Sequence, residues 1–314
     1  MPAVRRIRVI VNAAAGSGRA ADLEHRVAAA FEPSGVEVAI RSTRGPHDLD
    51  GCVQWARDGR PDVIVAGGGD GTVSAVASAL VDQEIALGVL PLGTLNHFAR
   101  DLGVPLDLEA AATTIATGRP RRVDVGEVNG RFFINNSSLG LYPDIVRDRE
   151  RQQQRLGRGK WPAMAWAIVA ALRRYPFMDV RLVVDGAERR RRTPFVFIGN
   201  NAYRMDGFAI GERSRLDRGC LSLYMAQRPG RLRLLQFALR ALIGTLRQDR
   251  DFDALLAGDI VIESRHRHLR VALDGEVTVM RPPLHYRIRR ASLSVILDPA
   301  DAADPADAVG DASS

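Results

Sequence analysis

The sequence contains little lysine and little cysteine, and both shortages exclude classes of mechanism. Lys160 is the single lysine among 44 lysine and arginine residues, which argues against a P-loop kinase because its phosphate-binding loop needs a lysine. The two cysteines, Cys52 and Cys220, are far apart in the sequence and fit neither a metal-binding spacing nor a disulfide framework. We expect them to be small core residues of a protein that works in a reducing cytoplasm.

Long hydrophobic runs and a secretion signal are also missing. The longest uncharged apolar stretch, Trp161–Leu172, is shorter than the roughly 20 residues that cross a bilayer. Met1–Arg8 leads directly into a strand-like run without the apolar region of a signal peptide. Aromatic residues make up only 6% and do not interleave with the dispersed basic residues, so no nucleic-acid partner is predicted. We expect a cytoplasmic protein that is not integral to a membrane.

Positive charge is in excess. With 44 basic and 37 acidic residues the formal net charge is +7, which favours anionic partners such as lipid headgroups and phosphorylated substrates. A solvated arginine-rich surface that binds nothing explains the same excess, so charge alone does not choose a partner. At 314 residues, 46% of them hydrophobic, the chain has enough material for two domains with buried cores.

Residues 1–124 alternate short β-branched runs with alanine-rich segments of helical length, a pattern typical of βαβ units around a parallel sheet. The predicted strands are Ile7–Val11, Val36–Ile40, Val63–Ala66 and Ile85–Leu90, and the predicted helices are Ala20–Phe31, Val73–Leu80 and Leu108–Thr117. In such sheets ligands bind beyond the carboxyl ends of the strands. The loops after Val11, Ala66 and Leu90 are therefore the candidate binding loops.

Residues 125–298 have the texture of an antiparallel β domain. The segments Val180–Val184 and Leu269–Leu273 alternate with period two and lead into Asp-Gly pairs at positions 185 and 274, which are typical two-residue hairpin signals. Two helical segments, Trp161–Arg174 and Arg231–Arg247, interrupt this domain. The second is amphipathic with a basic side, which either packs on its own sheet or contacts a membrane surface. Residues 299–314 have too little apolar bulk to order, so a disordered tail is predicted.

The three candidate loops are rich in glycine. The first, Asn12–Arg19, follows a strand and opens a helix, the geometry in which free backbone N–H groups hold phosphate. It also satisfies the dinucleotide pattern G-x-G-x-x-A, although a βα turn without a ligand has the same composition. The second, Gly67–Thr72, has four glycines in five positions, and Asp70 within it is a candidate for binding Mg²⁺. The third, Pro91–Gly103, adds polar side chains beside a further glycine.

These loops carry motifs of a known family. Asn12 with Gly16-Ser17-Gly18, then Gly68-Gly69-Asp70-Gly71-Thr72, then Pro91-x-Gly93-Thr94-x-Asn96-x-Phe98-Ala99-Arg100, and finally Asp274-Gly275-Glu276 occur in this order. On these motifs the chain resembles the diacylglycerol kinase catalytic family, which includes bacterial lipid kinases, sphingosine kinases and ceramide kinases. The resemblance implies an α/β fold in which an N-terminal parallel-sheet nucleotide-binding domain precedes an antiparallel β-sandwich domain that receives the lipid, with the active site between them.

The resemblance also implies which residues bind ATP. They are Asn12, Ala13, Ala14, Ala15, Gly16, Thr43, Gly67, Gly68, Gly69, Asp70, Gly71, Thr72, Thr94 and Asn96. Backbone N–H groups together with Mg²⁺ can position and neutralise the transferred phosphate without a P-loop lysine. The acceptor hydroxyl then needs a carboxylate as base. The family motif implies Glu276 for this role, with Asp274 next, and Asp70 as a further catalytic residue, although an Asp-Gly pair outside this context is more often only a hairpin turn.

One stretch departs from the family. Some members hold a structural Mg²⁺ with acidic residues of the second domain, and the matching stretch is Leu216–Cys220. Arg218 stands where an acidic residue is expected, so we expect this metal site not to be preserved, with Asp217 as the remaining candidate ligand. His266 and His268 are predicted on one face of a strand without a third metal ligand. The run Arg189–Arg192 is predicted on a hairpin, as surface charge or as a contact for phosphate or lipid headgroups.

The leading interpretation is an ATP- and Mg²⁺-dependent lipid kinase that phosphorylates the hydroxyl of diacylglycerol or a related long-chain lipid. It implies a peripheral position on the cytoplasmic side of the inner membrane, in contact with its lipid substrate. Two alternatives remain open at this point. One is an NAD kinase-like enzyme, which shares the Gly-Gly-Asp-Gly loop, and the other is a non-catalytic lipid-binding protein on a kinase fold.

Overall fold

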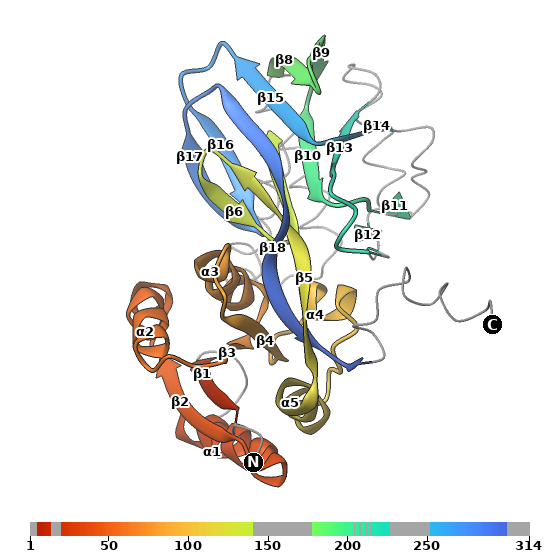
Figure 1. The fold of residues 1–314 in the computed structure, drawn as a ribbon. Helices are drawn as coiled ribbons and strands as arrows, with labels where there is room; N and C mark the ends of the chain where they lie inside the picture. The colour runs from red at the N-terminus through yellow and green to blue at the C-terminus, as the bar shows by residue number, and fades with distance from the viewer. Residues whose placement is uncertain are drawn as a thin grey trace, which may run out of the picture. The chain divides into compact units, whose positions relative to one another are not determined.

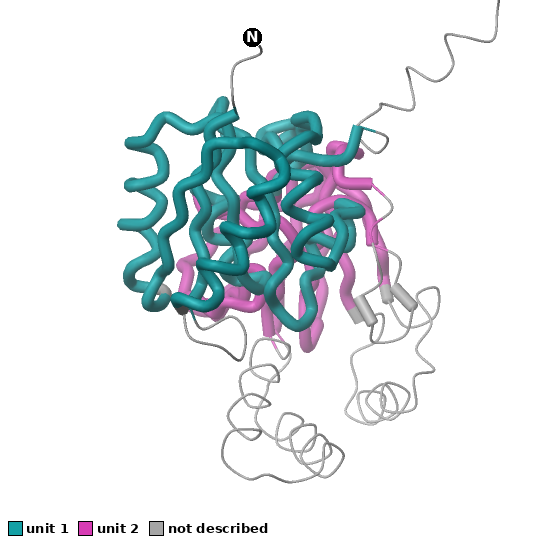
Figure 2. The backbone as a smooth tube through the Cα atoms, turned by 90° about the horizontal axis from the view of Figure 1, so that it is seen from below, with its two compact units in different colours: residues 1–125, 290–314 teal, residues 126–289 magenta. Residues whose placement is uncertain are grey.

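The computed structural model describes residues 5–13, 20–140, 178–203, 205–206, 209–210, 213, 215–226 and 252–299. The chain divides into two compact units, coloured separately in Figure 2: unit 1 takes residues 1–125 and 290–314, and unit 2 takes residues 126–289. The chain passes from unit 1 to unit 2 within strand β5 (Arg119–Val128) and returns within strand β18 (Leu284–Leu297).

Unit 1 contains a parallel sheet with the strand order β2-β1-β3-β4. The bounds are Arg6–Asn12 for β1, Glu37–Thr43 for β2, Val63–Gly68 for β3 and Ala86–Pro91 for β4. Val9 of β1 pairs with Ile40 on one side and Val65 on the other. The last part of β18 joins the sheet beside β4, with Val295 opposite Leu87. Strands β3 and β4 are buried along their whole length, as expected for a parallel sheet covered by helices on both faces.

The helices of unit 1 are α1 (Ala20–Phe31), α2 (Pro46–Asp58), α3 (Asp70–Leu80), α4 (His97–Asp101) and α5 (Leu108–Thr117), with the short 3₁₀ helix η1 (Glu32–Ser34) after α1. Helix α1 contacts α5, and α2 contacts α3 (Figure 1). Because the crossovers through α1 and α2 run in opposite directions along the sheet, right-handed connections place these two helices on opposite faces.

Unit 2 is a sandwich of antiparallel pairings. One sheet contains the first part of β18, then β15 (Asp259–Ser264), β8 (Met178–Val184) and β9 (Ala187–Thr193), with β5 and β6 (Arg131–Phe133) attached. The other has the order β14 (Phe252–Ala257), β13 (Leu221–Ala226), β10 (Phe195–Asn200), β7 (Asn136–Gly140), β16 (Leu269–Leu273) and β17 (Glu276–Met280). The two-residue strands β11 (Met205–Asp206) and β12 (Ala209–Ile210) pair separately.

The core of unit 2 combines alternate residues of both sheets. Leu182, Ile260 and Tyr286 come from the first sheet, and Ile198 and Val271 come from the second. All five are fully buried. Because successive residues of a strand point to opposite faces, the period-two pattern in the sequence leaves the polar residues of these strands on the outer faces. The predicted fold class, an α/β domain followed by an antiparallel β-sandwich, is therefore confirmed.

Most predicted elements of unit 1 are present with small shifts at their ends. The predicted helices Ala20–Phe31 and Leu108–Thr117 have these bounds, whereas α3 begins at Asp70, three residues before the predicted Val73. Helices α2 and α4 were not predicted. Helix α2 has a more polar composition than α1 and contains Gly51 in its middle, and its buried side is limited to Cys52, Val53 and Ala56, so few apolar residues mark it in the sequence.

The two predicted hairpins are confirmed as β8–β9 and β16–β17, and Arg189–Arg192 lies on β9. Cys52 is buried as predicted, whereas Cys220 is only half-buried. His266 and His268 lie in the connection between β15 and β16, so their predicted place on a strand is wrong. The segments Trp161–Arg174, Arg231–Arg247 and 300–314 lie outside the described residues.

Strand β18 is shared between the two units, whereas the sequence-based boundaries place it in one domain. The prediction assigned all of residues 125–298 to the second domain, but the residues of β18 from Arg290 onward lie in unit 1. Every residue from Ser292 to Leu297 is buried. A run that is buried on both faces suits a strand inside a helix-covered parallel sheet, next to β4, rather than a sandwich strand with one solvent face.

Candidate active site

The three glycine-rich loops of unit 1 begin at the same edge of the sheet, because β1, β3 and β4 are parallel. The side-chain amide of Asn12, at the end of β1, donates to the hydroxyl of Thr72 at 3.1 Å. The N–H of Leu92, after β4, donates to the carbonyl of Gly68 at 3.2 Å. The structure therefore brings together residues of all three predicted loops.

The second and third loops meet through two glycines. A Cβ added at Gly93 would lie 2.4 Å from the Cα of Gly69, and one added at Gly68 would lie 2.7 Å from the Thr72 side chain. Neither position can accept a larger residue without displacing a neighbour. Glycine at position 93 lets the backbones of the two loops approach, and glycine at position 68 leaves room for the Thr72 side chain within the second loop.

Asn96 shapes the third loop from within. It adopts the left-handed conformation with φ of 52° at the start of α4. Its carbonyl oxygen accepts from the Gly93 N–H at 3.0 Å, and its amide group donates to the carbonyls of Pro91 at 3.1 Å and Gly93 at 2.9 Å. The side chain is 9% exposed. These bonds assign Asn96 the task of folding the loop, while its predicted contact with ATP stays a prediction.

Thr43 serves the first loop in a similar way. The residue is buried at the end of β2, directly beside Asn12 in the register of the sheet. Its hydroxyl donates to the Gly45 carbonyl at 2.7 Å and accepts from the Gly45 N–H at 3.1 Å, and its own carbonyl accepts from the Ala13 N–H at 3.2 Å. Thr43 therefore joins the end of β2 to the start of the first loop.

Asp70 occupies the first turn of α3 and is partly exposed. The carbonyl of Gly69, the residue before it, accepts from the backbone N–H groups of Thr72 and Val73 at 3.0 and 3.1 Å. The positive end of the helix dipole stabilises a carboxylate at this position. Gly71 of the second loop and Thr94 of the third loop are also exposed. Ala14, Ala15 and Gly16 lie outside the described residues.

The fourth motif lies in unit 2, where Asp274 and Gly275 form the turn of the β16–β17 hairpin with φ of 48° and 89°. The carboxylate of Asp274 accepts from three consecutive backbone N–H groups: Ile134 at 2.9 Å, Asn135 at 2.8 Å and Asn136 at 2.9 Å. Both of its oxygens are engaged. Glu276, the first residue of β17, is exposed. Of the two predicted base candidates, Asp274 anchors the turn and Glu276 presents its carboxylate to solvent.

The same turn device recurs twice in unit 2. Asp185, with φ of 44°, accepts from the N–H groups of Gly258 and Asp259 at 3.0 Å each. Asn129, with φ of 47°, accepts from the His285 N–H at 2.8 Å. In all three hairpins a residue with positive φ precedes a glycine, and its side chain accepts hydrogen bonds from a neighbouring backbone segment. The Asp-Gly pair is thus a structural device, and only the following glutamate is particular to the predicted site.

A buried polar cluster supports the segment that Asp274 holds. Arg213, 3% exposed, donates to the carbonyls of Ile134 at 2.7 Å and Asn200 at 3.1 Å and to the side-chain oxygen of Asn135 at 2.7 Å. Its guanidinium carbon lies 5.0 Å from the ring centroid of Tyr203, whose hydroxyl donates to the Asn135 carbonyl at 3.0 Å. Sequence reasoning missed Arg213, because nothing in an arginine-rich sequence marks one arginine as buried.

Comparison with known proteins supplies the family. Residues 6–128 match the family model of the diacylglycerol kinase catalytic domain, and residues 144–297 match that of the YegS C-terminal NAD kinase beta sandwich-like domain. A YegS-like probable lipid kinase of Pseudomonas aeruginosa is 30% identical over 284 residues, which cover 85% of each chain. This chain belongs to the diacylglycerol kinase family. A diacylglycerol kinase of Bacillus subtilis is 29% identical over 286 residues, 89% of this chain and 92% of the relative.

Solved structures agree with the fold of this kinase. A diacylglycerol kinase from Bacillus anthracis covers 94% of this chain and 98% of its own, with a TM-score of 0.68 and 22% sequence identity. Relatives named as lipid kinases do not favour the NAD kinase-like alternative. Among the described residues of this kinase, no helix is long and apolar enough to cross a membrane.

Membership in a kinase family implies the use of a nucleotide and a divalent metal ion in general. The loops of unit 1 fit this requirement, because the backbones of Gly69 and Gly93 meet at the sheet edge and the partly exposed Asp70 follows directly in the first turn of α3. The described residues contain no group of three or more histidine, cysteine, aspartate and glutamate side chains that could hold a metal ion. A metal ion that accompanies the nucleotide would be held by Asp70 together with phosphate oxygens.

The predicted structural metal ligand Asp217 has a different partner. Its two carboxylate oxygens accept from Nε and Nη2 of Arg215 at 2.8 and 3.1 Å. The backbone N–H of Arg218 donates to the side chain of Asn201 at 2.9 Å, and the Arg218 side chain is exposed. The bidentate arginine satisfies the carboxylate without a metal ion, and a metal role for Asp217 stays a prediction.

Proposed function

We propose that this kinase transfers the γ-phosphate of ATP, with Mg²⁺, to the hydroxyl of diacylglycerol or a related long-chain lipid. In this reaction the acceptor oxygen forms a bond to the γ-phosphorus while the bond to the bridging oxygen of ADP breaks. The proton of the acceptor hydroxyl passes to a carboxylate of the protein. The reaction would take place at the cytoplasmic surface of the inner membrane, where a peripheral enzyme meets its lipid substrate.

The observation that carries this proposal is the packing of the Gly69 loop against the Gly93 loop. Phosphoryl transfer needs positioning and neutralisation of charge more than covalent chemistry. Backbone N–H groups held in place at the ends of β3 and β4 supply fixed dipoles for the phosphates. Asp70, at the first turn of α3, would take part in holding the metal ion that accompanies the nucleotide.

Glu276 is the base in this proposal. Its carboxylate is exposed at the start of β17, so it can reach a hydroxyl brought by a substrate. Asp274 acts as a positioning residue, since both of its oxygens already accept backbone hydrogen bonds. The names of the relatives, diacylglycerol kinase and YegS-like lipid kinase, support a lipid acceptor.

The test is transfer of labelled γ-phosphate from ATP to separate acceptors in mixed micelles. Diacylglycerol, monoacylglycerol, sphingosine, ceramide and phosphatidylglycerol cover the lipid classes, and soluble NAD covers the enzyme alternative. Label in one lipid names the acceptor. Label in NAD alone, or no label from protein that binds ATP, would overturn the proposal, and the second result would indicate a lipid-binding protein that has lost its chemistry.

The role of Glu276 is tested by Glu276→Gln. We expect kcat to fall by at least about 100-fold, the usual size of a general-base contribution, while the free energy of unfolding stays unchanged. Glu84→Gln is the matched control, because Glu84 is an exposed glutamate in a turn of unit 1 away from the motifs. Equal activity of both variants would remove Glu276 from the mechanism without touching the reaction class.

A further inference from the structure

A charged groove lies along the β8–β9 hairpin of the first sheet of unit 2, and none of its lining residues is assigned to catalysis. Its volume is about 700 Å³. Arginines line it from two parts of the chain, Arg181 and Arg190–Arg192 from the β8–β9 hairpin and Arg265 from the connection directly after β15, together with the carboxylates Asp179 and Glu263. We name this set the arginine groove. Its lining has three more positive than negative side chains.

The pleat of β8 explains why the groove is charged. Val180, Leu182 and Val184 point into the core of the sandwich, so Asp179 and Arg181 point outward. On the outer face Arg181 stands directly opposite Arg190 in the register of the hairpin. Two like charges at directly opposite positions destabilise a strand pair, so this arrangement needs compensation.

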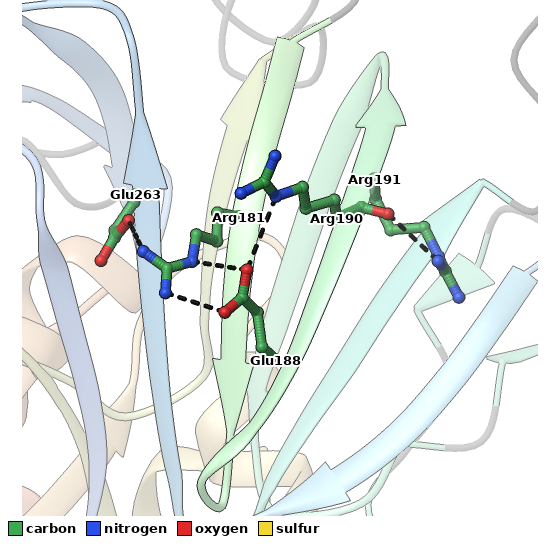
Figure 3. Close-up of polar contacts among 5 residues, drawn as sticks. All are labelled: Arg181, Glu188, Arg190, Arg191 and Glu263. Atoms are coloured by element: carbon green, nitrogen blue, oxygen red, sulfur yellow. Dashed lines mark hydrogen bonds and ion pairs between the residues drawn. The ribbon is translucent and has the colours of Figure 1, made fainter.

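Carboxylates compensate part of this charge, and Arg191 forms an ion pair with Asp253 of β14 at 3.7 Å. Arg181 lies between Glu188, 2.8 Å from its Nε, and Glu263, 3.0 Å from its Nη1 (Figure 3). Arg190 shares Glu188 at the longer distance of 3.5 Å, and its side chain is 81% exposed. Arg181 is thus neutralised, whereas Arg190 keeps most of its capacity to bind an anion from solution.

Protection of a sheet edge explains some of these arginines. Strand β9 is the last strand of its sheet, and charged side chains on an edge strand prevent pairing with other molecules. Edge protection does not account for Arg265, which lies outside β9 and lines the same groove from the connection after β15. Guanidinium groups that converge from two segments suit a ligand with phosphate oxygens, which arginine binds in bidentate fashion.

We propose that the arginine groove binds the phosphate groups of anionic lipid headgroups at the membrane surface. The choice of a lipid as the source of phosphate rests on the proposed function, since a lipid kinase must work where such headgroups are concentrated. An anionic membrane attracts basic residues near its surface. The groove is also open and bordered by exposed arginines, which suits several headgroups side by side.

The experiment measures binding to vesicles of phosphatidylcholine alone and of phosphatidylcholine with phosphatidylglycerol, by co-sedimentation at two salt concentrations. Wild-type protein should bind the anionic vesicles more tightly, and less so at high salt. Each arginine near the surface contributes roughly fivefold, so Arg190→Gln with Arg265→Gln should weaken binding by about 25-fold. Asp179→Asn removes a lining carboxylate and should strengthen binding several-fold.

Arg26→Gln with Arg119→Gln is the matched control, because both arginines are exposed in unit 1 and the variant loses the same charge. Its binding should stay within about twofold of wild type. An equal loss in both double variants would mean that net charge alone acts, and would overturn the inference. So would tighter binding of a DNA duplex than of anionic vesicles at the same salt, or saturation of the groove by inorganic phosphate without any loss of vesicle binding.

The two proposals fail separately. Phosphate transfer to a lipid in micelles, without preference for anionic vesicles, would remove the arginine groove as a membrane site and leave the kinase intact. Binding to anionic vesicles that depends on Arg190 and Arg265, without transfer to any lipid, would keep the groove and remove the proposed reaction.

Discussion

Asp274 and Asn136 are joined by a reciprocal pair of hydrogen bonds. The N–H of Asn136 donates to the Asp274 carboxylate at 2.9 Å, and the N–H of Asp274 donates to the Asn136 carbonyl at 2.8 Å. This pair fastens the β16–β17 turn to the start of β7. Because Glu276 follows the turn directly, the position of its backbone is determined by the same bonds.

Asp274→Asn should therefore damage the fold as well as the activity. The carboxylate uses both oxygens, one for Ile134 and the other for Asn135 and Asn136. An amide has a single acceptor oxygen, so its NH₂ group would face a backbone N–H. We expect a loss of about 1 to 3 kcal/mol in the free energy of unfolding, measured in urea, together with a fall in kcat.

Asp185→Asn is the matched control. Asp185 accepts both of its backbone bonds on one oxygen, so an amide oxygen can keep them, and Asn129 of the third hairpin already uses its amide oxygen to accept one such bond. We expect a change of less than about 0.5 kcal/mol. If Asp274→Asn instead abolished activity with an unchanged free energy of unfolding, Asp274 would be a base itself rather than a positioning residue.

Gly93→Ala should separate the second and third loops. The new Cβ would lie 2.4 Å from the Cα of Gly69 and 2.8 Å from the side-chain oxygen of Asn96. A backbone atom cannot move aside cheaply, so we expect a loss of about 1 to 3 kcal/mol in stability. The affinity for ATP, measured by calorimetry, should fall as well.

Gly51→Ala tests whether this result is particular to the loops. Gly51 lies within α2, and its added Cβ would meet nothing closer than the Asp48 carboxylate at 3.8 Å. Alanine in the middle of a helix should raise stability by about 0.5 to 1 kcal/mol. Wild-type stability and ATP affinity in Gly93→Ala would show that the two loops do not need their close approach.

The sequence was sufficient for most of the fold because its periodicities reflect burial. Period two in Val180–Val184 and continuous apolar runs at Val63 and Ala86 correspond to a half-buried and two fully buried strands. The end of β18 was not predictable in the same way. Its buried residues belong to a sheet whose other strands lie more than 200 positions earlier, as the pairing of Val295 with Leu87 illustrates.

For the candidate site, the sequence indicated the residues but not how each is used. It grouped Asn96 with the ATP ligands, which stays a prediction, but it did not indicate that three hydrogen bonds of this side chain hold the Pro91–Gly93 backbone. It ranked Asp274 directly after Glu276 as a candidate base but did not show that the Asp274 carboxylate is engaged while Glu276 is exposed. Side-chain roles of this kind depend on which backbone groups lie within hydrogen-bonding distance, and a motif does not record those distances.

Tyr286→Phe should lower the free energy of unfolding and should remove the further decrease that the wild type shows at alkaline pH. The Tyr286 hydroxyl hydrogen-bonds to the Ser137 hydroxyl at 2.9 Å, and both residues are fully buried. Loss of one partner should lower the free energy of unfolding by about 1 to 2 kcal/mol. The double variant Tyr286→Phe with Ser137→Ala should lose less than the sum of the losses in the two single variants. An additive double variant would show that the bond contributes nothing.

The pH dependence follows from burial, which raises the pKa of Tyr286 well above its ordinary value. The unfolded chain releases this proton near pH 10, whereas the folded protein retains it. Stability is therefore fully present below about pH 10 and is lost as pH rises further, by up to about 1.4 kcal/mol per pH unit. Urea unfolding of wild type and Tyr286→Phe between pH 9 and 11 measures how the free energy of unfolding changes with pH. Equal slopes against pH in the two proteins would contradict this role of Tyr286.

Glu188 should make the β8–β9 hairpin sensitive to acid. Hydrogen bonding to Arg181 lowers the pKa of Glu188 below its ordinary value. Its contribution to stability is therefore present above the pKa of the unfolded chain, near 4.3, and is lost as pH falls through the lower folded pKa. Below that point Arg181 and Arg190 face each other without the shared carboxylate. Amide hydrogen exchange across β9 should then accelerate before exchange in β10 does.

Two variants are the controls. In Glu188→Gln, exchange in β9 at pH 6 should already be fast and should change little with acid. In Arg181→Met, the titration midpoint of Glu188, followed by NMR, should return toward the ordinary value. A midpoint that ignores Arg181 would mean that this ion pair does not persist in solution.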